Sequence, residues 1–235
     1  LGHRLLSRDA LYREVLAAVN GVRLTESRLL LVYQWRPELM AEAGARGRAA
    51  LFGPGERARL LAYQEALAEA TRRFQAGSRV SVLALMRPLF QLARERGGDP
   101  VAENRAALTV LALYFQGVDL GRLLGLEGAP RPRPGRYALT GREDFAQHFL
   151  ISAGMTVAAG GQVADAVGLF KEVDDSRGGS GFSFTDLAAD RAGVRFAETA
   201  TASRAAARRV QDLLAEGAGE DEIGRASCRE RVYTK

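Results

Sequence analysis

The chain has 235 residues, of which 47% are hydrophobic, 26 are glycine and one is cysteine. This apolar content is enough to bury a sizeable core, and it excludes a disordered chain, a collagen-like chain and a disulfide-bonded scaffold. Charged residues interrupt every apolar stretch before the roughly 18 residues that a membrane span needs. The longest such stretch is Phe149 to Gly161, so no transmembrane helix is predicted.

The two ends of the chain need separate treatment. Residues 223–235 look like the in-frame translation of a short-read sequencing adapter, so we expect a cloning or assembly scar outside the fold. Without it the chain has 29 basic and 27 acidic residues, a net charge of +2, and no cysteine, because Cys228 lies in this tail. Disulfides and thiol catalysis are then excluded. The chain begins with Leu1 rather than Met, and we expect an N-terminal segment with any export signal to be missing.

Apolar residues at helical spacing predict four helices in the first half of the chain, at 9–20, 55–77, 79–95 and 100–115. Gly21 is expected to stop the first helix, and apolar residues recur from Leu29 to Trp35. Pro88 is expected to kink or break the third helix. Asp99 as the cap and Pro100 at the first position should start the fourth, which ends at Gly117.

Prolines at alternate positions between Leu126 and Arg136 favour an extended backbone, so this stretch is predicted to be a linker. Beyond it the pattern predicts four more helices, at about 140–160, 162–175, 184–200 and 203–215. Thr140 and Glu143 fit a capping box at the first of these, and Ser183 with Asp186 can cap the third. A short strand at Tyr137–Leu139 is the one strand considered. The fold class is therefore all-α, a multi-helix bundle with a three- to four-helix region after the linker.

We accordingly expect four parts: a helical N-terminal region at 1–125, a proline-rich linker at 126–139, a helical region at 140–222 and the tail at 223–235.

The chemistry-bearing residues lie on the helices after the linker. His148 and Ser152 share one helix face, and Asp186 and Asp190 share another, each pair one turn apart. Two carboxylates at that spacing repel each other, so a positive group is expected nearby. The second helix carries Lys171, the one lysine before the tail, next to Glu172. Further candidates for binding are Asp175, Arg177 and Ser183, and Gly193 is most simply explained by a close helix crossing.

Three strings stand out between Asp144 and Gly193: Asp144-Phe-Ala-Gln-His-Phe, Lys171-Glu-Val-Asp-Asp-Ser-Arg and Gly-Gly-Ser-Gly-Phe-Ser-Phe-Thr-Asp186-Leu-Ala-Ala-Asp-Arg-Ala-Gly. Together they resemble the YfiM-like family of bacterial periplasmic lipoproteins. A looser likeness extends to VanZ-like membrane proteins, from which this chain departs because it has no long apolar spans. The resemblance implies a periplasmic or cell-envelope location, with an envelope protein or membrane surface as partner, and it implies little about activity.

Two functional interpretations remain open, and a third is disfavoured. In the first, His148, Lys171, Glu172, Asp186 and Asp190 form a polar network that holds three helices of a non-enzymatic envelope protein. In the second, His148, Glu172, Asp186 and Asp190 are the catalytic or metal-ligating residues of an acid–base or metal-dependent enzyme. Nucleic-acid binding is disfavoured because acidic residues intersperse the arginines and no aromatic platform accompanies them.

The expected cofactor content follows from the same residues. No cofactor is expected under the first interpretation. Under the second, a closed zinc site is disfavoured because one histidine and no cysteine are available, whereas Mg²⁺, Mn²⁺ or Ca²⁺ accept oxygen ligands. Each candidate also has a purely structural explanation: Asp186 as a capping acid, and Lys171 as the partner of Asp175 in a solvated ion pair.

Overall fold

The computed structural model describes residues 19–24, 29–33, 54–75, 77–126, 128–158 and 184–228. Contacts divide the chain into two units, Leu1–Ala50 and Leu51–Lys235, and the elements of each unit are described separately. The division falls after Ala50, within the region 1–125 that the sequence analysis treated as one part.

The described part of the first unit is a β-hairpin. Strand β1 (Val19–Leu24) pairs antiparallel with β2 (Leu29–Tyr33), with an irregularity between Val19 and Gly21. The prediction of a helix that reaches residue 20 and stops at Gly21 is therefore wrong at its end, and residues 9–18 lie outside the described ranges. Valine and tyrosine favour strands. In an apolar run this short, however, the spacing of the residues alone cannot distinguish a strand from a helix.

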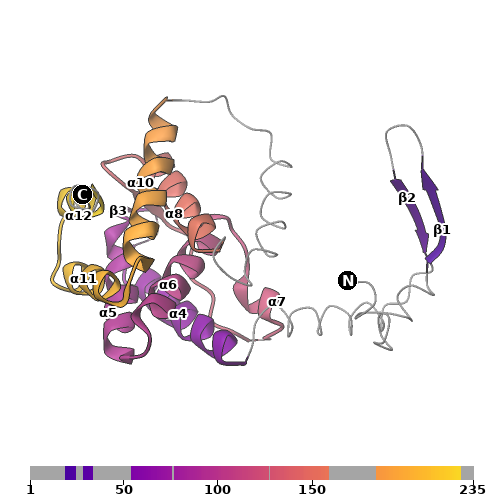
Figure 1. Ribbon diagram of the computed structural model, residues 1–235, viewed down its shortest axis with the longest axis horizontal. Helices are drawn as coiled ribbons and strands as arrows, with labels where there is room; N and C mark the ends of the chain where they lie inside the picture. The colour runs from indigo at the N-terminus through magenta and orange to yellow at the C-terminus, as the bar shows by residue number, and fades with distance from the viewer. Residues whose placement is uncertain are drawn as a thin grey trace, which may run out of the picture. The chain divides into compact units, whose positions relative to one another are not determined.

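The second unit is a helical bundle, and Figure 1 shows its helices packed against one another. Its first half contains α4 (Pro54–Arg72), β3 (Arg79–Ser81), α5 (Leu83–Arg96), α6 (Pro100–Phe115) and α7 (Leu120–Leu124). Its second half contains β4 (Arg136–Ala138), α8 (Glu143–Ala158), α10 (Phe184–Thr201), α11 (Arg204–Ala215) and α12 (Glu220–Cys228). The all-α class is thus confirmed.

Helix α6 lies at the centre of this bundle, in contact with α4, α5, α8, α10 and α11. Every residue from Ala106 to Leu113 is buried, which explains why its sequence is apolar on all sides. Gly117, with a left-handed backbone (φ 71°), ends the helix as the sequence predicted. Helices on both sides of the proline-rich stretch therefore share one core.

Residues 129–135 of the proline-rich stretch contain no helix, as predicted, and they are tied to the bundle. The carbonyl of Pro130 accepts a hydrogen bond from Gln64 of α4, at 2.9 Å. Arg133 donates its backbone N–H to Thr71 (2.9 Å) and accepts from the Tyr114 hydroxyl (2.7 Å). Strand β4 then pairs in parallel with β3, so the short strand expected around Tyr137 is present one residue earlier.

Around α5 and α6, the structure differs from three predictions about where helices begin or break. Helix α5 runs unbroken through Pro88, with Met86 and Leu89 fully buried beside it, so packing outweighs the hydrogen bond that proline removes. The first residues of the helix predicted at 79–95, residues 79–81, form β3 instead. Asp99 occupies the cap position of α6 without a capping hydrogen bond, and its carboxylate lies 3.7 Å from Arg204.

The predicted capping box at Thr140 and Glu143 is wrong. Thr140 has a left-handed backbone (φ 49°), its hydroxyl donates to the carbonyl of Leu139, and its N–H donates to Glu220 of α12 at 2.7 Å. The Glu143 carboxylate instead accepts from Arg136 at 2.7 Å, and these hydrogen bonds hold the pKa of Glu143 below its usual range. The Thr140 hydroxyl and the Glu143 carboxylate thus each have a partner other than the backbone N–H groups that a capping box would use.

Candidate functional site

The candidate site is built where α8 and α10 pack side by side (Figure 1). A Cβ atom added to Gly193 of α10 would lie 2.1 Å from the carbonyl oxygen of Phe149 in α8, closer than any side chain tolerates. On α8 itself, a Cβ on Gly154 would lie 2.2 Å from the Cβ of Ala112 in α6. The close helix crossing expected at Gly193 is therefore present, and Gly154 allows a second close approach, that of α8 to α6.

Asp190 connects the two helices one turn before this crossing. Its Oδ1 atom accepts a hydrogen bond from the Ser152 hydroxyl at 2.7 Å and lies 3.1 Å from Nδ1 of His148. A carboxylate can only accept, so we assign the imidazole hydrogen to Nδ1. His148 and Ser152 lie one turn apart on α8, which is why one oxygen on α10 reaches both.

Asp186 extends the contact toward the start of α10. Its Oδ2 atom lies 3.9 Å from Nε2 of His148, and its Oδ1 atom lies 4.0 Å from Arg142. Arg142 also binds Asp144 and lies over the ring of Phe145, 4.0 Å from the centroid. Hydrogen bonding from Arg142 lowers the pKa of Asp144 from its usual value. Arg142 is thus a positive group close to one of the two carboxylates of α10, that of Asp186.

We call His148, Ser152, Asp186 and Asp190 the His148 cluster. It is open to solvent, since 41% of the His148 side chain and 38% of the Asp190 side chain are exposed. Among the described residues, no group of three or more histidine, cysteine or acidic side chains is arranged to hold a metal ion. Within the same residues no helix is both long and apolar enough to cross a membrane.

The structure brings together some of the predicted site residues and does not describe others. His148, Asp186 and Asp190 meet, with Ser152 as an additional donor. The remaining candidates lie outside the described residues: Lys171, Glu172, Asp175, Arg177 and Ser183.

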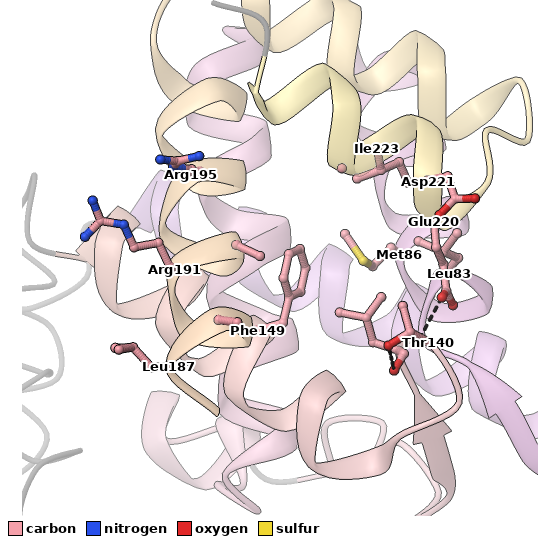
Figure 2. A pocket seen from close by; sticks show the side chains of 14 residues that line it. Leu83, Met86, Thr140, Phe149, Leu187, Arg191, Arg195, Glu220, Asp221 and Ile223 are labelled. Carbon is pink, nitrogen blue, oxygen red and sulfur yellow. Dashed lines mark hydrogen bonds between the residues drawn. The ribbon is translucent and has the colours of Figure 1, made fainter. Parts of the chain in front are cut away.

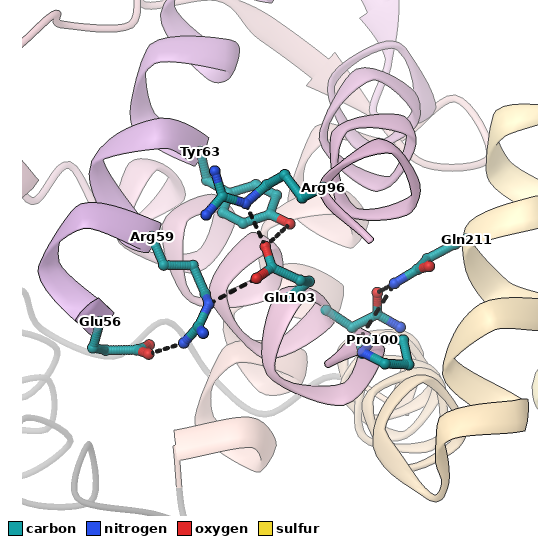
Figure 3. A network of polar contacts seen from close by, with 8 residues as sticks. Glu56, Arg59, Tyr63, Arg96, Pro100, Glu103 and Gln211 are labelled. Atoms are coloured by element: carbon teal, nitrogen blue, oxygen red, sulfur yellow. Dashed lines mark hydrogen bonds and ion pairs between the residues drawn. The ribbon is translucent and has the colours of Figure 1, made fainter. Parts of the chain in front are cut away.

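A second polar centre, on α6, was not predicted from the sequence (Figure 3). The carboxylate of Glu103 is almost fully buried, with 4% of its side chain exposed. It accepts from Arg59 (2.9 Å) and Tyr63 (2.9 Å) of α4 and from Arg96 (2.8 Å) of α5. Burial and the neighbouring carboxylate raise the pKa of Tyr63, so its hydroxyl stays protonated and donates.

Asn104, next to Glu103, makes a parallel set of contacts toward the C-terminal helices. Its amide donates to the carbonyls of Ala200 (2.8 Å) and Ala207 (3.1 Å), and its oxygen accepts from Gln211 at 2.8 Å. Gln211 also reaches the carbonyl of Pro100, at 3.3 Å (Figure 3). The available sequence signal was the polar run Glu103-Asn104-Arg105 inside an otherwise apolar helix.

Compared with known proteins, the chain matches no family model, no curated protein and no solved structure.

Proposed function

We propose that residues 140–222 form a non-enzymatic helical module of the bacterial cell envelope, in which the His148 cluster fixes how α8 and α10 pack. The envelope location derives from the resemblance of residues 144–193 to YfiM-like lipoproteins. The proposed network also includes Lys171 and Glu172 on the intervening segment. Its role is to specify one packing arrangement, because polar groups between helices select a register more than they add stability.

One observation carries this proposal. The single oxygen of Asp190 that accepts from both His148 and Ser152 lies one turn from Gly193, where α10 comes closest to the backbone of α8. Sliding α10 by one residue would break both hydrogen bonds and move Gly193 away from Phe149. The polar contacts and the glycine contact therefore favour the same register.

The test is thermal melting of the protein and of three variants, His148→Ala, Asp190→Ala and Glu172→Ala. Each is melted alone and with added Mg²⁺, Mn²⁺ or Ca²⁺. For the two described positions we expect a loss of about 1–2 kcal/mol, or roughly 2–8 °C in Tm, since each variant loses hydrogen bonds to a charged group that is partly screened by solvent. Gln147→Ala, an exposed position on α8, is the matched control and should melt like the wild type.

The same measurement tests the alternative, a metal-dependent or acid–base enzyme. The partial exposure of His148 between two carboxylates is what favours this alternative. If the variants melt as high as the wild type, or if a metal raises the Tm of the wild type alone, the cluster is retained for binding or catalysis. Either outcome would overturn the structural role.

The location is tested separately, by fractionating cells that produce the natural full-length protein. We expect the protein in the envelope fraction. Recovery in the cytoplasmic fraction would remove the envelope part of the proposal and leave the helix-packing role unaffected.

A further inference from the structure

We draw no further inference here: the strongest candidate, the groove beside α10 (Figure 2), is lined by as many carboxylates as guanidinium groups, and nothing in the part of the chain that the structure describes shows what covers it.

Discussion

At the scale of single residues, the structure depends on buried polar side chains whose hydrogen bonds are satisfied. Glu103 illustrates this, because its carboxylate is buried on α6 and its two oxygens accept from two arginines and a tyrosine. A buried charge without such partners would cost several kcal/mol. The Glu103 contacts therefore bind α4 and α5 to the central helix in one arrangement.

Replacement of Glu103 tests this role. Glu103→Ala should lower the free energy of unfolding by about 3 kcal/mol, or roughly 6–12 °C in Tm, because the Tyr63 hydroxyl and the inner guanidinium groups lose their acceptor. Glu69→Ala is the control, since Glu69 makes an exposed i,i+3 ion pair with Arg72, which contributes little. A Glu103→Ala protein that melts within a degree of the Glu69→Ala protein would contradict the assignment.

A second residue-scale prediction concerns acid. The hydrogen bonds from Arg136 lower the pKa of Glu143, so their stabilisation is present above the ordinary carboxyl pKa and is lost as the pH falls through the lowered one. Glu143→Gln should therefore melt slightly below the wild type at pH 7 and together with it at pH 2, as measured by circular dichroism. A gap that persists at pH 2 would show that the loss is not electrostatic.

At the scale of elements, the pair α8 and α10 shows how a missing side chain positions a site. Gly193 and Gly154 lie on the helices that carry the His148 cluster, and each contacts a neighbouring helix where a Cβ would not fit. Glycine costs about 1 kcal/mol of helix propensity relative to alanine, and close packing compensates for this cost. The distance between His148 and Asp190 thus depends on residues that have no side chain.

Gly193→Ala should lower the free energy of unfolding by about 2 kcal/mol, because the new methyl group would force α10 away from the Phe149 carbonyl. Gly55→Ala on α4 is the matched control. Nothing lies within 4 Å of its added Cβ, so it should be neutral or stabilising by up to about 1 kcal/mol. Chemical denaturation of both variants gives the comparison, and a Gly193→Ala protein as stable as the wild type would refute the close-crossing role.

At the scale of the whole molecule, the core belongs to the second unit. Its buried residues come from both sides of the proline-rich stretch, from Leu60 on α4 to Ile223 on α12, the first residue of the tail that was expected to lie outside the fold. The proline-rich stretch is held to α4 and α6 by hydrogen bonds at Pro130 and Arg133. The helices before and after it should therefore unfold together.

A chain that begins at Leu51 should accordingly fold and melt in a single transition. Its Tm should lie within a few degrees of that of the longer chain, because the contacts divide after Ala50. Differential scanning calorimetry of both chains makes the comparison. Two separate transitions in the shorter chain would contradict the single core and support a domain boundary at the proline-rich stretch.

The amino-acid sequence by itself determined the helical class, the positions of α4, α6, α8, α10 and α11 within a few residues, and the close crossing at Gly193. These features follow from local spacing, since apolar periodicity and glycine positions act within one or two turns. The hairpin at 19–33 was missed because short apolar runs fit either secondary structure.

Only the tertiary structure decided which polar side chains meet. Thr140 and Glu143 have the spacing of a capping box, yet each binds a residue outside it, Glu220 and Arg136. Glu103 was not singled out from the sequence, and its partners lie 7, 40 and 44 residues earlier in the chain. A side chain forms hydrogen bonds with the groups that lie near it in the folded protein. The local sequence does not predict these partners, because it does not show which helices pack together in the core.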